Sequence, residues 1–182
     1  MKRKGFTLIE LIVVIAIIGI MSALLIPAML GYIAKSKIQN ANAAAKEIYS
    51  GMNLAYVEMV QQDFDVHFMT GITTTTNTAV MQAVNQNLPS RPTDDEDEMT
   101  AIFYTKVHNY FTDIEKVDQI SYSVTAGSCT ATGVILRNYP GSHPIAIGSD
   151  DYYAETDNHV TWDSALALTY AIGQGSAQPD NP

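Results

Sequence analysis

The chain opens on one long apolar stretch. Residues 11–30 carry no charged side chain, and residues 5–30 hold a single acid, Glu10. A helix rises ~1.5 Å per residue, so about 20 apolar residues cross the ~30 Å hydrocarbon core of a bilayer. Residues 2–4 are cationic, which favours an N-terminus left in the cytoplasm. The apolar run exceeds the roughly 7–15 residues of a signal peptide, and no small-residue cleavage site follows it, so we predict a retained membrane anchor.

The helical pattern continues beyond the anchor. Helix-favouring residues dominate as far as Gln62, and no proline follows Pro27 in this stretch. Apolar side chains then recur at alternating spacings of three and four, at Ile38, Ala41, Ala45, Ile48, Met52, Ala55 and Met59. We expect one helix from Phe6 to about Gln62, apolar all round in its first half and amphipathic in its second. The apolar stripe predicts packing on a folded domain; a free coiled-coil dimer is the alternative.

A less regular segment follows the helix. Residues 63–77 read as a break, and the threonine run 73–76 as a loop. A short helix is expected over 78–88, closed by Pro89.

An acidic run precedes the next predicted helix. We expect Thr93 to cap it and Glu96 to complete a capping box, with the acids at the positive helix end. A calcium loop would alternate its ligands around a glycine, which this run does not do. The apolar face of this helix is predicted at Met99, Ile102, Phe103, Val107, Tyr110 and Phe111.

From Gln119 onward the pattern changes to the alternation of β-strands. Ile120, Tyr122 and Val124 alternate before a break at Gly127-Ser128. Further strands are expected at 132–139, ended by Pro140-Gly141, around 145–147, within 152–162 and over 166–172. An Ala-rich helix is the alternative for 166–172, and a frayed tail is expected at 173–182. The predicted fold is α+β, with a long N-terminal helix packed on an antiparallel β-sheet.

The composition and the motifs of the chain argue against several classes of function. The chain of 182 residues has a net charge of −9, which is unsuited to nucleic acid as the main ligand because phosphate contacts need Lys and Arg. One cysteine, Cys129, excludes a disulfide within the chain. No nucleotide-binding, serine-hydrolase or zinc-protease motif is found, and the four histidines lack ligand spacing, so we predict that the protein is not an enzyme.

A second acidic group lies near the C-terminus. It is formed by Asp150, Asp151, Glu155, Asp157, Asn158 and Asp163. We interpret it as a solvated face and expect no cofactor, with calcium as the alternative ligand.

The stretch Lys4-Gly5-Phe6-Thr7-Leu8-Ile9-Glu10, followed by an apolar run with Gly19 and Pro27, resembles the leader junction of bacterial type IV prepilins and the related pseudopilins. The resemblance covers roughly residues 1–35 and implies a type IV pilin-like fold. It implies that a prepilin peptidase cleaves after Gly5 and that Phe6 is N-methylated. The expected domains are a leader (1–5), an apolar membrane and assembly helix (6–34) and a globular pilin domain (35–182).

Within the apolar helix, we expect three residues, Glu10, Gly19 and Pro27, to act in assembly. A carboxylate in a membrane span is costly, so Glu10 needs a cation. The family implies that its partner is the Phe6 amine of a neighbouring subunit, which would fix axial register; snorkelling to the headgroups is the alternative. Pro27 should kink or loosen the helix between Ala23 and Pro27, and Gly19 adds backbone freedom in the same region. Filaments of the family imply a melted segment from Gly19 to Pro27; a mild kink of the membrane helix is the alternative.

The expected function is that of a structural subunit of a type IV pilus. Its partners would be other copies of itself, the prepilin peptidase, and an inner-membrane assembly platform with its ATPase. The chain would cross the cytoplasmic membrane once, with the globular domain outside, and then enter an extracellular filament. A pseudopilin of a type II secretion system or a competence pilin is the alternative. A membrane-tethered binding domain or enzyme would instead predict no cleavage at Gly5 and tolerance of Glu10 replacement.

Overall fold

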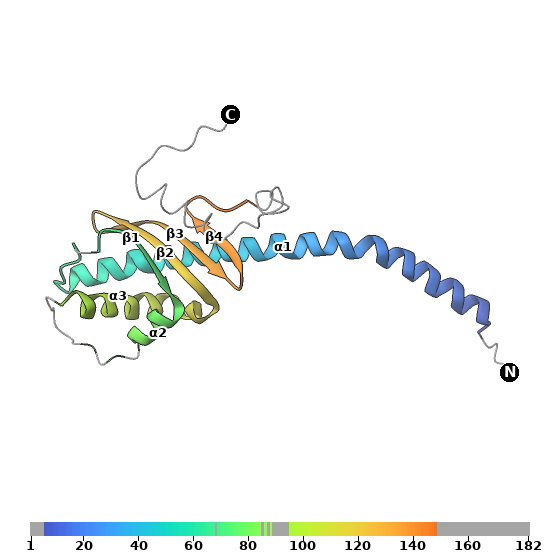
Figure 1. Cartoon of the computed structure of the whole chain (residues 1–182), viewed down its shortest axis with the longest axis horizontal. Helices are drawn as coiled ribbons and strands as arrows, with labels where there is room; N and C mark the ends of the chain where they lie inside the picture. The colour runs from blue at the N-terminus through green and yellow to red at the C-terminus, as the bar shows by residue number, and fades with distance from the viewer. Residues whose placement is uncertain (1–5, 68, 85, 87, 89–94, 149–182) are drawn as a thin grey trace, which may run out of the picture. The chain divides into compact units, whose positions relative to one another are not determined.

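The computed structural model describes residues 6–148 except 68, 85, 87 and 89–94 (Figure 1). The chain divides into two compact units, residues 1–36 and residues 37–182, which we call the N-terminal unit and the head. The elements in order are α1 (Leu8–Gln61), β1 (Gly71–Thr76), α2 (Asn77–Val84), α3 (Glu96–Tyr110), the 3-10 helix η1 (Thr112–Lys116), β2 (Val117–Thr125), β3 (Ser128–Leu136) and β4 (Tyr139–His143). The strands expected at 152–162 and 166–172 and the expected tail lie outside the described residues.

The predicted long helix is confirmed as α1, within two residues at its start and one at its end. It is helical throughout, with Pro27 inside it, and the melting implied from Gly19 to Pro27 in a filament stays a prediction. A proline removes one backbone donor, and the turns on either side retain their own hydrogen bonds.

The apolar stripe of α1 forms one wall of the head's core. The predicted residues Ile38, Ala41, Ala45, Ile48, Met52, Ala55 and Met59 are each at most 1% exposed. β3 and β4 approach α1 closely: Thr132 Oγ1 donates to the Ala45 carbonyl at 2.8 Å, and a Cβ on Gly141 would overlap the backbone of Ala41. The predicted packing of the helix on a sheet is therefore confirmed (Figure 1).

The sheet is antiparallel, with strand order β1-β2-β3-β4. Thr75 of β1 pairs with Ile120 of β2, and Tyr122 of β2 pairs with Thr132 of β3. The α+β prediction is thus confirmed, but the loop predicted over 73–76 is wrong, because those threonines form β1. Threonine is β-branched and suits a pleated strand better than its polarity suggests.

The later strand boundaries also differ from those predicted. β3 begins at Ser128 rather than 132, and its turn is made by Arg137 and Asn138, which adopt φ of 49° and 69°. Pro140 and Gly141 lie inside β4, and the strand predicted around 145–147 is wrong, because these residues follow β4 without forming a strand. A proline is tolerated in β4 because β4 is an edge strand among the described strands.

The short helix predicted over 78–88 is present as α2, which ends at Val84. The cap predicted for the next helix is wrong, because Asp95 caps α3, and Thr93 lies outside the described residues. Asp95 Oδ1 accepts from the backbone N–H groups of Asp97 and Glu98, both at 3.0 Å. Asp and Thr are both good N-cap residues, and Thr93, Asp94 and Asp95 follow one another, so the sequence does not single out one of them as the cap.

Most of the predicted apolar face of α3 is buried. Tyr110 is the exception at 49% exposed, with its hydroxyl 3.4 Å from Glu58 Oε2. A Cβ added to Gly51 of α1 would lie 3.2 Å from the Tyr110 Cβ. The glycine at position 51 therefore permits α1 and α3 to pack closely. Tyrosine can pack its ring in this way and keep its hydroxyl at the surface.

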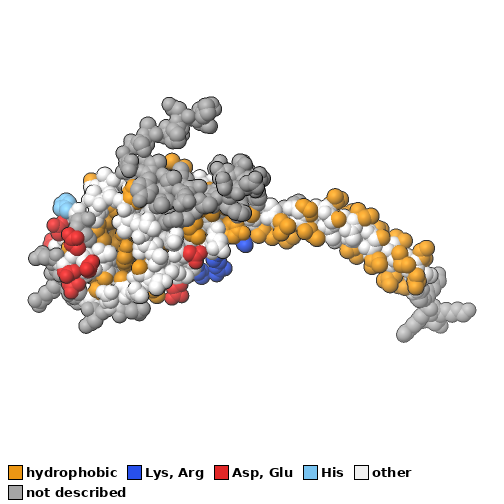
Figure 2. Space-filling model, viewed as in Figure 1, with side chains coloured by type: hydrophobic (Ala, Val, Ile, Leu, Met, Phe, Trp, Pro, Cys, Tyr) orange, Lys and Arg blue, Asp and Glu red, His pale blue; other side chains and the backbone are white. Residues whose placement is uncertain are grey.

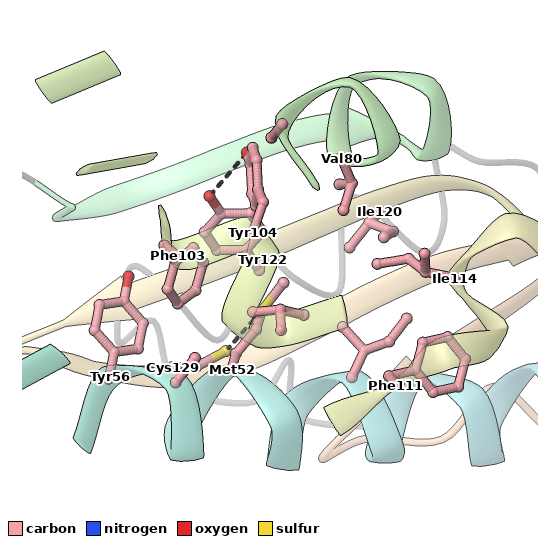
Figure 3. Packing of buried hydrophobic residues seen from close by; sticks show 14 of the residues in the cluster. Met52, Tyr56, Val80, Phe103, Tyr104, Phe111, Ile114, Ile120, Tyr122 and Cys129 are labelled. Atoms are coloured by element: carbon pink, nitrogen blue, oxygen red, sulfur yellow. Dashed lines mark hydrogen bonds between the residues drawn. The ribbon is translucent and has the colours of Figure 1, made fainter. Parts of the chain in front are cut away.

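Aromatic side chains fill the centre of the core (Figure 3). The Phe103 ring lies 4.7 Å from that of Tyr56 and 6.1 Å from that of Tyr122. The hydroxyls of Tyr104 and Tyr122 are 3.2 Å apart and share a hydrogen bond. Cys129 is buried and free, and burial raises the pKa of its thiol to about 12.

Candidate assembly and processing site

The N-terminal unit has large apolar side chains on every side of its helix. An 18-residue window of α1 reaches a mean hydropathy of 2.9 with none of it buried, so by length and composition α1 could cross a membrane. Figure 2 shows this apolar surface along the helix. The exposed large side chains are Phe6, Leu8, Ile9, Leu11, Ile12, Val13, Val14, Ile15, Ile17, Ile18, Ile20, Met21, Leu24, Leu25, Ile26, Met29 and Leu30. Apolar patches of this extent mark contact with lipid or protein.

The single acid of this unit takes part in the start of α1. Glu10 Oε2 accepts from the backbone N–H of Thr7 at 2.8 Å and from its hydroxyl at 2.7 Å. The Glu10 N–H in turn donates to Thr7 Oγ1 at 3.4 Å. Because Thr7 directly precedes the first helical residue, the two residues form a capping box. Glu10 therefore has a local partner within its own chain.

The role of Thr7 was missed at the level of sequence. The signal was available, since Thr7-Leu8-Ile9-Glu10 fits the Ser/Thr-x-x-Glu pattern that starts a helix before an apolar run. Glu10 draws attention first as a charge in an apolar run, and that reading leaves its bond to Thr7 unnoticed.

The other predicted site residues are dispersed along the N-terminal unit. Phe6 is 87% exposed at the start of the described chain, and Gly5 lies outside the described residues. A Cβ on Gly19 would meet nothing within 4 Å, so no contact described within the chain requires a glycine there. Pro27 is exposed as well. The structure brings Glu10 together with Thr7 and places Gly19 and Pro27 further along the same helix.

Two asparagines of α1, also missed from the sequence, attach the sheet to the helix. Asn42 Oδ1 accepts from the N–H groups of Ser142 at 2.9 Å and Ile147 at 3.1 Å, and its amide donates to the Ile147 carbonyl at 2.9 Å. Asn53 Oδ1 accepts from the Cys129 N–H at 3.0 Å, and its amide donates to the Cys129 carbonyl at 3.2 Å. No pattern in the sequence distinguishes these asparagines from solvated ones.

The described residues do not gather metal-ligating side chains into a site. Among the described residues, no group of three or more His, Cys, Asp or Glu side chains could hold a metal ion. The acids from Asp150 to Asp163, for which calcium was the alternative, lie outside the described residues. The His143 ring lies 4.7 Å from the Tyr49 ring and is tilted by 57° to it; the burial of His143, together with the charge of Lys46, lowers its pKa.

Comparison with known proteins connects this N-terminal unit to one family. Residues 1–26 match the model of the prokaryotic N-terminal methylation motif. The fimbrial protein EcpC of Eikenella corrodens is 47% identical over 55 residues, which cover 26% of this chain and 36% of that protein. The type IV major pilin PilA of Myxococcus xanthus is 40% identical over 57 residues, 31% of this chain and 26% of its own length.

A shorter match is closer in sequence. The type IV major alpha-pilin of Moraxella bovis is 63% identical over 35 residues, 19% of this chain and 22% of that protein. The chain thus spans well under two thirds of the length of these relatives. No solved structure matches the chain significantly. The motif, these relatives and the α+β fold confirm the predicted resemblance: this chain carries the N-terminal methylation motif of prokaryotic pilins and is related to type IV pilins and fimbrial proteins.

Proposed function

We propose that this chain is the structural subunit of a type IV pilus filament. The observation that carries the proposal is the exposed apolar helix of the N-terminal unit. This helix begins within the residues that match the methylation motif. Such a helix has to lie in lipid or among other apolar helices. Burying one Leu, Ile or Val side chain contributes about 1.5–3 kcal/mol, so transfer from the membrane to a bundle of identical helices keeps that burial while joining subunits.

Processing at the N-terminus would precede assembly. A prepilin peptidase would cleave between Gly5 and Phe6, and the new amine of Phe6 would be methylated. Intact mass of filament protein should correspond to a chain that lacks residues 1–5 and carries one methyl group. Full-length protein in filaments would contradict this assignment.

Glu10 would then set the register between neighbours by pairing with the Phe6 amine of another subunit. A carboxylate buried among apolar helices without a cation is strongly unfavourable, so one axial offset is selected. The capping box offers a competing explanation, in which Glu10 only stabilises the first turn of α1. The two roles depend on different properties of the side chain, namely its charge and its acceptor oxygen.

Three variants separate these roles in cells that make the chain. Glu10→Gln keeps a side chain suited to the capping box but removes the charge, and Glu10→Leu removes both. Thr7→Val keeps the charge and removes the hydroxyl. We expect Glu10→Gln and Glu10→Leu to be inserted and cleaved normally and to make few filaments, with Thr7→Val much closer to the unmodified chain. Electron microscopy and immunoblotting of sheared filaments measure the outcome.

Normal filaments from Glu10→Gln would assign Glu10 to the cap, and normal filaments from Glu10→Leu would refute its role in assembly. Glu10→Asp should give an intermediate number, since its charge remains but its reach is shorter.

Assembly would also need an inner-membrane platform and an ATPase, because the sequence has no nucleotide-binding motif of its own. The chain would first cross the cytoplasmic membrane with its head outside and later reach the cell surface. Gly19 and Pro27 would give the helix local freedom as it leaves lipid for the filament. The relatives are named as pilins and fimbrial proteins, which supports a surface filament over a secretion pseudopilin.

A further inference from the structure

We propose that a basic hollow on the head receives the acidic first turn of α3 from a second copy of the chain. The basic hollow is lined by Lys37, Asn40, Lys116, Leu136, Arg137 and Tyr139. The acidic turn consists of Glu96, Asp97 and Glu98. The inference rests on the proposed function, and it identifies a contact between heads in addition to the packing of N-terminal helices.

The hollow is built by α1, η1, the facing ends of β3 and β4 and the turn between them. Its volume is about 420 Å³, and none of its lining residues is acidic. Lys37 Nζ lies 4.8 Å from the centre of the Tyr139 ring and 3.4 Å from its hydroxyl. A cation over an aromatic face is held in place without losing its charge.

Arg137 is presented by the β3–β4 turn. It adopts φ of 49°, and the next residue, Asn138, is held by a 3.4 Å bond from its N–H to Asp118 Oδ2. Lys116 pairs with Asp113 at 2.7 Å, but among the described residues neither Lys37 nor Arg137 forms an ion pair. Two cations of the hollow are therefore available to an outside carboxylate.

The acidic turn is a matching surface on the same molecule. Glu96, Asp97 and Glu98 are exposed, and none of them forms an ion pair among the described residues. Asp95 holds the backbone of this turn through its capping bonds. The turn can therefore offer its carboxylates from a fixed backbone.

The two surfaces lie at opposite ends of the head. Lys106 of α3 contacts Glu58 and Gln62 near the end of α1, so α3 begins beyond that end. The hollow includes Lys37, about 36 Å earlier along α1 at ~1.5 Å per residue. Figure 2 shows acidic side chains gathered at the end of the head where α3 begins, and Lys and Arg, with a few acids beside them, towards the other end.

This arrangement favours an open chain of subunits. A contact between two different patches is heterologous, and it produces a helical filament when the rotation does not close into a ring. Single exposed ion pairs contribute little, so the contact needs several charges together. It should weaken with salt, since the screening length is about 8 Å at physiological ionic strength.

Charge reversal in the full chain tests the contact. We expect Lys37→Glu/Arg137→Glu and Asp97→Lys/Glu98→Lys each to lower the yield of sheared filaments about tenfold, the equivalent of about 1.4 kcal/mol per contact. The combined variant with all four changes restores complementarity at every interface and should regain most of the yield. Lys46→Glu, an exposed reversal on α1 outside the hollow, is the matched control and should assemble normally. Membrane level and cleavage of each variant, measured in parallel, exclude loss of the protein itself.

The outcomes distinguish this inference from the proposed function. Normal filaments from both double variants, or no recovery in the combined variant, would overturn the contact and leave the pilus subunit in place. Absence of filaments from the unmodified chain would overturn both. A disulfide between Arg137→Cys and Asp97→Cys, formed between subunits in oxidised filaments, would support the contact independently, with Arg137→Cys/Glu47→Cys as the control pair.

Discussion

Residues 8–30 and residues 38–59 belong to one helix, yet their apolar side chains meet opposite surroundings. In the second region the stripe from Ile38 to Met59 is buried against the sheet and α3. In the first region apolar residues occupy every face, and all the large ones are exposed. The apolar side chains of the second region are covered within the chain, whereas those of the first region must be covered by lipid or by other chains. A sequence can thus assign intramolecular and intermolecular packing to two parts of one element through the width of its apolar surface.

Removing the first region should have the largest effect. Without residues 1–36, the head should become soluble and monomeric with its core intact, because the stripe on α1 is covered within the head. Size-exclusion chromatography and circular dichroism of the truncated chain measure this. Aggregation or an unfolded spectrum would show that the head depends on the N-terminal unit.

Gly141→Val should be the most damaging single change in the head. The new side chain would overlap the backbone of Ala41, which cannot move aside by changing rotamer, so we expect a loss above ~4 kcal/mol or failure to fold. Gly19→Ala is the matched change in the N-terminal unit, where an added Cβ meets nothing. Limited proteolysis of the full chains in detergent should cleave the first variant rapidly and leave the second like the unmodified protein.

Met52→Ala should destabilise the head by about 2–4 kcal/mol, because Met52 is 1% exposed within the core. Ile17→Ala, in the exposed region, should leave the melting temperature of the head unchanged and weaken filaments instead. Thermal unfolding of detergent-solubilised full chains and filament yield provide the two measurements. An equal shift in melting for both variants would contradict the division between the two regions.

The smallest effect concerns pH. Burial raises the pKa of Cys129 from 9.0 to about 12, so the folded thiol stays protonated after the unfolded thiol has ionised. The unfolded state then binds fewer protons, and stability is complete below pH 9 and falls between about 9 and 12. Burial also raises the pKa values of Tyr56 and Tyr122, which adds to the fall above pH 10.

Denaturant unfolding of the truncated head should show a loss of about 1 kcal/mol between pH 8 and 10. Cys129→Ala should show a smaller loss over the same range. An equal loss in both proteins would mean that Cys129 does not titrate as described.

Repeated patterns were the most predictable part of the fold. The stripe on α1 is predicted correctly because its seven positions follow one regular alternation of spacings of three and four. The threonines of β1 were misread because their strand preference depends on pairing with β2, which lies more than 40 residues later along the chain. Pro140-Gly141 looked like a turn, but it forms an edge strand whose glycine fits against α1, a distant contact that no local pattern reveals.

The residues of the candidate site likewise divide into those that the sequence reveals and those that only the fold reveals. Glu10 stood out because it is one charge in an apolar run, while its bond to Thr7 followed from a short pattern that was overlooked. Asn42 and Asn53 could not be found, since their partners lie some 75 to 105 residues away in sequence. The basic hollow likewise depends on residues from α1, η1, β3 and β4 that only the fold brings together.

The attachment of the sheet to α1 has a mechanical consequence. Asn42 and Asn53 lie about 16 Å apart along the helix at ~1.5 Å per residue, with the Ala45 carbonyl between them bound by Thr132. Apolar contacts are non-directional and tolerate sliding, whereas hydrogen bonds are lost when their atoms move apart. A pull along α1 therefore loads these hydrogen bonds in shear, and they resist the sliding of the helix past the sheet together. We expect a head with Asn42→Ala and Asn53→Ala to yield at lower force in single-molecule pulling along the helix; an unchanged force would place the resistance elsewhere.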